Sequence, residues 1–250
     1  MPDPAELLSF YEDAYSREPA EAALYARWRA LGAVGKADHV IELCRRAGLD
    51  PVSTLEVGCG DGALLSELHR RGFGGRVSGV EISEAAVAIA RTRTEIDSVE
   101  RYDGRRVPAP TGAYDLGILS HVLEHVAEPA DLLAEVGRAC RAVLVEVPLE
   151  ANWSARRAAK RRQAAEVGHL QRLDRRAARE MIARAGLSLA CDLDDPLPAQ
   201  VHRFFATTRA ARTAATMKWA ARAALHGVAP PLARRLFTVH YACLCLPPAV

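Results

Sequence analysis

Runs of aliphatic residues alternate with amphipathic stretches along most of this 250-residue chain. After residue 51, short apolar runs of strand length are separated by segments whose apolar residues recur every three or four positions, as on one face of a helix. Such alternation predicts an α/β fold with a doubly wound, mostly parallel, seven-stranded sheet. The expected strands are 52–57, 76–82, 97–101, 114–119, 141–147, 187–193 and 237–246, and the expected helices are 62–71, 84–94, 129–138 and 174–185.

The residues before this alternating region are predicted to be helical. Tyr11 and Tyr15 belong to one aromatic stripe, and Tyr25 and Trp28 belong to a second. A third helix is expected over Ala37–Arg46. Aromatic residues at helical spacing usually pack into a core, so packing is one interpretation of both stripes.

A glycine-rich turn follows the first expected strand. Gly58, Gly60 and Gly62 stand between that strand and the next helix, where the backbone must turn sharply and can approach a ligand closely. A turn of this kind, at the carboxyl end of a parallel strand, is a ligand platform. The acidic residues Glu56 and Asp61 beside it do not suit a pyrophosphate and favour a cationic or neutral ligand.

Five segments, in order, resemble the motifs of class I S-adenosyl-L-methionine (SAM)-dependent methyltransferases, and together they cover roughly residues 50–190. They are Leu55-Glu-Val-Gly-Cys-Gly-Asp-Gly62, the acid Glu81 at the end of the second strand, Arg101-Tyr-Asp-Gly104 with Val107-Pro108, Tyr114 to Val126, and Gly168 to Leu173. The resemblance implies a Rossmann-like methyltransferase fold with an antiparallel last strand. It also implies an N-terminal helical lid over residues 1–50 and a SAM-binding domain over 51–250. Insertions at 148–172 and 196–235 are expected to shape the substrate pocket, with Trp153 or Trp219 near the acceptor.

The resemblance also assigns residues to the cofactor. Glu81 is expected to bind the ribose hydroxyls and Asp103 the adenine amine, with Tyr102 or Ile82 against the ring. The complete expected set is Glu56, Gly58, Cys59, Gly60, Asp61, Glu81, Ile82, Tyr102, Asp103 and Ser120.

The acceptor side of the site is expected around His121, the candidate general base. One helical turn would place His121, Glu124 and His125 on a common face, and His169 follows the next strand. Some branches of the family, including the ubiquinone-biosynthesis O-methyltransferases, bind a divalent metal through a related pattern. Three imidazoles and one carboxylate would suit Zn, Fe, Mn or Co. The alternative is an ordinary methyltransferase helix without metal, in which His121 acts alone.

Charge is unevenly distributed along the chain. Residues 1–150 hold 16 Lys+Arg against 25 Asp+Glu, whereas residues 151–250 hold 17 against 6. A basic half indicates either a solvated face or an anionic partner such as nucleic acid or lipid. Because aromatic residues are not interleaved with the arginines, nucleic acid is not the expected partner.

Taken together, the sequence predicts SAM-dependent O-methylation of a small molecule. Two alternatives stay open: a methyltransferase that acts on RNA or on a lipid-like substrate through the basic half, and a non-enzymatic SAM-binding protein. No apolar run reaches the roughly 18 residues that span a bilayer, and the N-terminus does not resemble a signal peptide. The six cysteines lack a metal or disulfide spacing. We therefore expect a cytoplasmic protein, whose oligomeric state the sequence leaves open.

Overall fold

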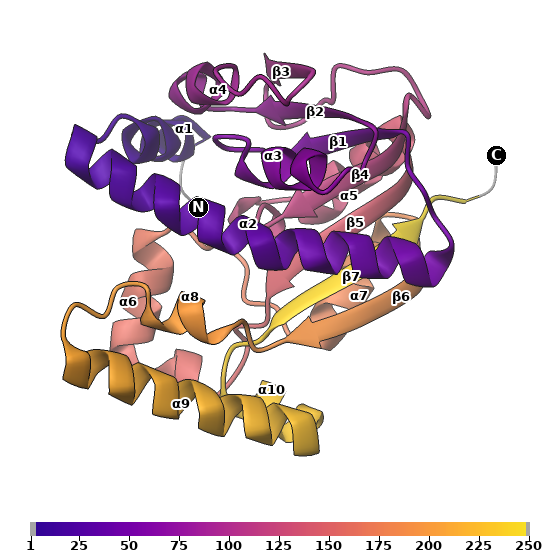
Figure 1. Ribbon diagram of the computed structural model, residues 1–250. Helices are drawn as coiled ribbons and strands as arrows, with labels where there is room; N and C mark the ends of the chain where they lie inside the picture. Colours follow the sequence, from indigo (N-terminus) through magenta and orange to yellow (C-terminus); the bar gives the residue numbers. More distant parts are fainter. Residues whose placement is uncertain (1–3, 249–250) are drawn as a thin grey trace.

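The computed structural model describes residues 4–248, in which seven strands form one sheet in the order β3-β2-β1-β4-β5-β7-β6 (Figure 1). The strands are β1 (Ser53–Val57), β2 (Arg76–Glu81), β3 (Ser98–Arg101), β4 (Tyr114–Ser120), β5 (Cys140–Pro148), β6 (Ser188–Asp195) and β7 (His240–Leu246). Strands β1 to β5 pair in parallel, and β7 lies antiparallel between β5 and β6. The predicted fold class, including the reversed last strand, is confirmed.

Helices cover both faces of the sheet. The structure places α2 (Pro19–Ala47), α3 (Ala63–Arg70) and α4 (Glu84–Ala90) on one face, and α5 (Pro129–Ala139) and α7 (Arg175–Arg184) on the other (Figure 1). Alternate residues of the central strands supply the two cores. In β5, for example, Leu144 packs with α2 and α3, whereas Val143 and Val145 pack with α5 and α7.

The N-terminal region contains two helices in place of the three expected. The helix predicted over Ala37–Arg46 is the last part of α2, which runs for 29 residues and ends at Gly48 in a left-handed conformation (φ 65°). Gly32 and Gly35 lie inside it. Each costs about 1 kcal/mol relative to alanine, but α2 buries Val40 and Leu43 against the sheet, and this packing overrides the local preference.

The first helix, α1 (Pro4–Tyr15), is attached to the start of α4. The Glu12 carboxylate accepts hydrogen bonds from the backbone N–H groups of Glu84 (2.6 Å) and Ala85 (3.0 Å) and from the Ser83 hydroxyl (3.2 Å). These bonds hold the pKa of Glu12 below its usual value. A carboxylate at this place accepts hydrogen bonds from the free N–H groups of the first helical turn and interacts favourably with the positive end of the helix dipole.

The two insertions form a separate layer of short helices and one long helix. Their elements are η2 (Ser154–Arg156), α6 (Ala158–Glu166), α8 (Ala199–Arg203), α9 (Arg209–Val228) and α10 (Pro230–Leu236). Figure 1 shows this layer beyond the β6–β7 side of the sheet, away from α4. None of the helices in the described part of the chain combines the length and apolar character needed to cross a bilayer.

Replacing Glu12 should loosen α1 without unfolding the sheet domain. Glu12→Ala removes all three bonds to the start of α4, so amide hydrogens of α1 should exchange faster by hydrogen-exchange mass spectrometry, while those of β4 and β5 stay protected. Asp13→Ala, one position along on the exposed side of α1, is the matched control. Equal exchange in both variants would show that Glu12 does not hold the helix.

Candidate active site

A cavity of about 1200 Å³ lies at the carboxyl ends of the parallel strands, beside the paired strands β1 and β4, where the strand order reverses. Its floor is the glycine turn after β1. Helices α1 and α2 contribute Tyr11, Tyr15 and Trp28 to its walls, and the insertions contribute Leu170 and Leu197. A crevice at the point where neighbouring strands of an open parallel sheet diverge is the usual ligand site of such folds.

Every residue expected to bind the cofactor lines this cavity. The set is Glu56, Gly58, Cys59, Gly60, Asp61, Glu81, Ile82, Tyr102, Asp103 and Ser120. These residues lie in or just after four strands, and the first and last of them, Glu56 and Ser120, are 64 positions apart in the sequence.

The glycine turn is held in a shape that side chains would prevent. Gly58 and Gly60 have φ angles of 75° and 54°, and the Gly58 N–H donates to the carbonyl of Val80 (2.8 Å). A Cβ atom at Gly58 would lie 2.6 Å from Cγ2 of Val122. Positive φ and close approach both require glycine at this position.

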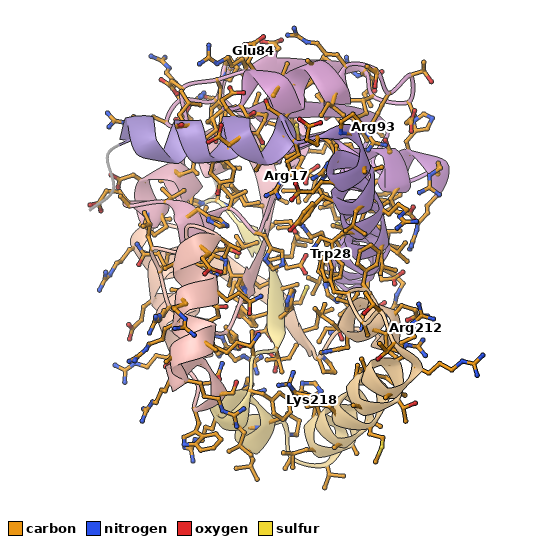
Figure 2. The ribbon with its side chains drawn as sticks, turned by 90° about the vertical axis from the view of Figure 1, so that its left-hand side faces the viewer. Arg17, Trp28, Glu84, Arg93, Arg212 and Lys218 are labelled. Carbon is orange, nitrogen blue, oxygen red and sulfur yellow. The ribbon has the colours of Figure 1, made fainter. Side chains whose placement is uncertain are left out.

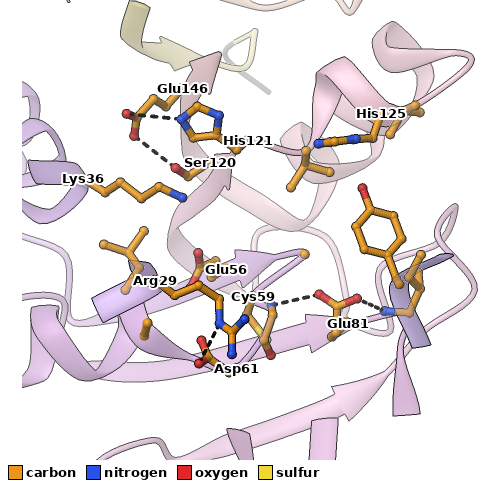
Figure 3. A pocket seen from close by; sticks show the side chains of 18 of the residues that line it. Arg29, Lys36, Glu56, Cys59, Asp61, Glu81, Ser120, His121, His125 and Glu146 are labelled. Atoms are coloured by element: carbon orange, nitrogen blue, oxygen red, sulfur yellow. Dashed lines mark hydrogen bonds and ion pairs between the residues drawn. The ribbon is translucent and has the colours of Figure 1, made fainter. Parts of the chain in front are cut away.

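The Glu81 carboxylate connects this turn to the end of β2. It accepts hydrogen bonds from the backbone N–H groups of Gly60 (2.8 Å), Ile82 (2.7 Å) and Ser83 (3.1 Å) (Figure 3). Burial raises the pKa of Glu81 despite these three donors. The side chain is thus placed between the turn and the cavity, where ribose hydroxyls could reach it.

The two acids next to the glycines differ in how their charge is matched. Asp61 pairs with Arg29 (2.9 Å) and Arg93 (3.3 Å). Glu56 is buried, and its Oε2 has no hydrogen-bond partner among the described residues. Burial raises the pKa of Glu56 to about 8, against the opposing charge of Lys36. Glu56 is therefore the acid left to meet a cationic group of a ligand.

The expected adenine end is more open. Oδ1 of Asp103 accepts from the backbone N–H groups of Arg105 (2.8 Å) and Arg106 (2.7 Å), which lowers the pKa of Asp103. Tyr102 is largely enclosed, and burial raises the pKa of its hydroxyl. This arrangement offers a ring surface beside a loop carboxylate.

At the other end of the cavity, His121 lies in a buried polar cluster. Its Nδ1 is 2.9 Å from Oε1 of Glu124, and its Nε2 is 3.0 Å from Nδ1 of His240. Glu146, from β5, accepts from the Ser120 hydroxyl (3.0 Å) and contacts His240 (3.5 Å). Burial and the charge of Lys36 oppose protonation of His121, but Glu124 and Glu146 raise its pKa overall.

The expectation that His121, Glu124 and His125 share one helical turn is wrong. His121 has φ +60°, in the left-handed region, and only Leu123–His125 forms a 3-10 turn. The chain turns sharply because the His121 N–H donates to the carbonyl of Glu146 (2.9 Å), which keeps it on the sheet. Backbone strain at a non-glycine residue is common at functional sites.

The four expected metal ligands therefore do not gather at one point. Their donor atoms fall into two groups, each with atoms within 4.8 Å of one another: His121 with Glu146 and His240, and Glu124 with His125 and His169. Glu124 links the groups through its bond to His121. The two groups are separate because the turn after β4 directs His121 away from His125.

The second group has the features of a ligand set. Nδ1 of His125 is bonded to the carbonyl of Gly168 (3.1 Å), and Nδ1 of His169 to Glu150 (2.8 Å). These bonds leave the Nε2 atom of each ring as the acceptor. Oε2 of Glu124 is buried without a hydrogen-bond partner among the described residues.

The sequence interpretation missed several residues of the cavity. Glu146 and His240 contact His121, and Lys36 points toward Ser120 and His121 (Figure 3). Behind the cavity lining, His39 bonds Glu146 (3.2 Å) and Asp195 (2.9 Å). One signal was available for Glu146, since a carboxylate inside an apolar strand needs buried partners. The others lie on helices and strands remote in sequence.

The two tryptophans expected near the acceptor do not line the cavity. Trp153 is 58% exposed on the far side of its turn. Trp219 supports the wall from behind, because its indole N–H donates to the carbonyl of Leu197 (2.8 Å). Leu197, like His121, has a positive φ (64°).

Comparison with known families agrees with this fold. The family described as "Methyltransferase domain" matches residues 18–191, well over half of the chain. The chain therefore belongs to this family, that of the class I SAM-dependent methyltransferases.

Curated relatives match a shorter part of the chain. The ubiquinone biosynthesis O-methyltransferase of Acinetobacter baumannii (strain ACICU) is 31% identical over 106 residues, 40% of this chain and 42% of the relative. That of Pseudomonas paraeruginosa (strain DSM 24068 / PA7) is 35% identical over 101 residues, 38% of this chain and 40% of the relative. The chain thus spans about two fifths of the length of these relatives.

Solved structures share the fold over more of the chain. A geranyl diphosphate methyltransferase in complex with SAM aligns with a TM-score of 0.63 and 18% identity, over 95% of this chain and 94% of that one. The [4+2]-cyclase SpnF aligns with a TM-score of 0.59 and 19% identity, over 86% and 82%. At these identities the likeness concerns the fold.

Glu81→Gln should weaken SAM binding. The substitution keeps the size of the side chain but removes the charge that accepts ribose hydroxyls, at a cost of about 1.5–3 kcal/mol for hydrogen bonds to a charged group. Isothermal titration calorimetry with SAM measures this cost. Glu100→Gln, on the exposed side of β3, should bind like the wild type, and unchanged affinity in a folded Glu81→Gln variant would remove Glu81 from the cofactor site.

Proposed function

We propose that this protein transfers the methyl group of SAM to a hydroxyl oxygen of a small molecule. The observation that supports this function best is one cavity that has the glycine turn and Glu81 at one end and the His121–Glu124 pair at the other. Relatives named ubiquinone biosynthesis O-methyltransferases support a hydroxyl acceptor.

In this proposal, the cofactor half of the cavity positions the sulfonium. Glu81 binds the ribose, Asp103 faces the adenine, and Glu56 attracts the ammonium or sulfonium charge. Tyr11 and Tyr15, from the lid helix α1, help to exclude water from above the glycine turn. Alignment of the methyl group with its acceptor supplies much of the acceleration in such a transfer, because the leaving group is already activated by its positive charge.

His121 is the proton acceptor in the proposed reaction. An Nδ1–H bond to Glu124 fixes the tautomer and makes Nε2 the nitrogen that can accept the hydroxyl proton. Because Nε2 is 3.0 Å from Nδ1 of His240, the acceptor hydroxyl takes the place of His240 in this hydrogen bond. The acceptor oxygen attacks the methyl carbon, the carbon–sulfur bond breaks, and S-adenosylhomocysteine and a methyl ether form. The hydroxyl proton passes to Nε2 of His121, so atoms and charge balance.

We also propose that Glu124, His125 and His169 hold the divalent metal expected from the sequence. The buried Oε2 of Glu124, unpartnered among the described residues, and the Nε2 atoms that the Nδ1 bonds leave as acceptors on both histidines fit a transition metal such as Zn, Fe, Mn or Co. When bound, such an ion would act as a Lewis acid toward an acceptor oxygen. His121 then contacts this ligand set through Glu124.

His121→Ala should lower kcat by about 10²–10⁴-fold, the usual contribution of a general base, and leave SAM affinity unchanged. Formation of S-adenosylhomocysteine from SAM with a panel of phenols and catechols, followed by mass spectrometry, measures turnover. His69→Ala, on the outer side of α3, is the control. If wild-type protein binds SAM but no acceptor yields S-adenosylhomocysteine, the non-enzymatic alternative replaces this proposal.

Metal binding can be measured without turnover. Chelated wild-type protein titrated with Co²⁺ should develop ligand-field absorption bands at one equivalent, and His169→Ala should lose them while keeping SAM affinity. His202→Ala removes a histidine of α8 outside the group and should behave like the wild type. The ligand set would be contradicted if wild-type protein develops no bands. It would also be contradicted if His169→Ala develops the same bands as the wild type.

A further inference from the structure

The long helix of the second insertion, α9, presents an apolar face to solvent. Its exposed positions at helical spacing are Ala210, Ala214, Met217, Ala220, Ala221, Ala224 and Val228, with Thr213 among them. Met217 is 69% exposed and Val228 87%. The opposite side of α9 is attached to the protein, because Trp219 donates to the carbonyl of Leu197. The apolar face is thus turned away from the core.

Other exposed apolar side chains lie on elements joined to α9. Leu232, 46% exposed, is on α10, which packs against α9. Trp153, 58% exposed, stands on the turn before α6, and its backbone N–H donates to the carbonyl of Arg235 in α10 (2.8 Å). Exposed apolar side chains gathered on elements that contact one another favour an interaction site.

The same segments are strongly basic. Residues 151–172 and 196–238 hold 13 Lys+Arg and a single acid, Glu166. Among the described residues, Arg157, Lys160, Lys218 and Arg222 form no ion pair. They are close enough that the charges of Arg222, Lys160 and Arg157 lower the pKa of Lys218, with burial adding to the effect. No ion pair within residues 4–248 therefore compensates this positive charge.

We propose that α9, α10 and residues 153–161, together called the basic apolar face, dock on a membrane that carries anionic phospholipids. Apolar side chains on one side of a helix can enter the boundary between headgroups and acyl chains, while flanking cations contact the phosphates. Figure 2 shows Lys218 and Arg212 on α9 at the end of the molecule opposite Glu84. The exposed side chains of Met217 and Val228 show that the sheet domain does not cover the apolar face of α9.

The chemistry of the face favours a membrane over other occupants. Base stacking on RNA needs aromatic platforms, and the outer side of α9 offers alanine, methionine and valine in their place. A second copy of the chain would bring a second set of unpaired cations against the first, and like charges at an interface oppose association. An anionic lipid surface matches both the charge and the apolar strip.

Docking would bring the cavity close to the lipid. Leu197, Pro198 and Val201 line the cavity on the segment that leads into α9. An acceptor with an apolar tail could then pass from the membrane to His121. This statement about the acceptor rests on the proposed function, whereas docking itself does not.

Vesicle sedimentation tests the docking with phosphatidylcholine vesicles prepared with and without phosphatidylglycerol. Wild-type protein should sediment with the anionic vesicles, remain largely in solution with the neutral ones, and be released by salt, which screens the attraction. Met217→Glu and Ala221→Glu should each reduce sedimentation. Lys160→Gln combined with Lys218→Gln should weaken it about 30-fold, since each cation near an anionic surface contributes roughly fivefold.

Two matched controls carry the same chemical changes elsewhere. Val52→Glu alters a side chain that is 72% exposed at the start of β1, and Arg76→Gln removes an exposed cation at the start of β2. Both should sediment like the wild type. Sedimentation that is equal with neutral vesicles, or unaffected by the changes on α9, would overturn the proposal. A third result would also overturn it: the protein does not bind vesicles but binds single-stranded RNA, and Lys160→Gln and Lys218→Gln weaken the RNA binding.

SAM affinity of each variant is measured in parallel by calorimetry. It should stay at the wild-type value, because none of the substituted residues lines the cavity. If wild-type protein binds anionic vesicles but shows no turnover, the proposed function is contradicted and the docking proposal stands. If it shows turnover but does not bind these vesicles, the docking proposal is contradicted and the proposed function stands.

Discussion

Three backbone N–H groups converge on the carboxylate of Glu81, and the cavity depends on that convergence. A buried carboxylate is stable only when its oxygens are hydrogen-bonded. The bond from Gly60 fixes the glycine turn after β1, and the bonds from Ile82 and Ser83 fix the chain between β2 and α4. Glu12 binds the next N–H groups of the same segment and thereby attaches α1. Two carboxylates thus hold parts of the cavity in place. Glu81 fixes the glycine turn that forms its floor, and Glu12 attaches α1, which contributes to its wall.

The acceptor end of the cavity relies on a different buried carboxylate. Glu146 is contacted by His39 from α2, Ser120 from β4 and His240 from β7. Burial opposes its charge, but His121, His240 and His39 together hold the pKa of Glu146 well below its usual value. Hydrogen bonds to Asp195 and Glu146 raise the pKa of His39 to about 10, although burial opposes its charge. Removing one partner from such a cluster would leave a charge buried without compensation. Four elements are therefore locked together around His121 before any ligand arrives.

The insertions follow other rules. Their helices bury little surface, and no residue of α9 is fully buried. The bonds of Trp219 to Leu197 and of Trp153 to Arg235 join parts of the insertions to one another. The insertions are attached to the domain at the turn after β4, where the backbone N–H groups of Leu170 and Gln171 both donate to the carbonyl of Glu124. A layer of this kind is suited to a surface role, with its cations and exposed apolar side chains available to a partner, while the cavity behind it is shaped by Leu197 and its neighbours.

The sequence by itself determined the sheet and brought the proposed cofactor residues to one cavity. Strand–glycine–helix patterns are local, and residues at the ends of parallel strands must meet at one edge, so Gly58, Glu81 and Asp103 could be placed from spacing and resemblance. The sequence could not show that α2 is continuous through Gly32 and Gly35, because packing against β5 and β7 decides this. It also could not separate His121 from His125 and His169. Only the tertiary structure brings Glu146 and His240 to His121, since a pairing between β5 and the reversed β7 joins residues 94 positions apart, and no local pattern encodes that contact.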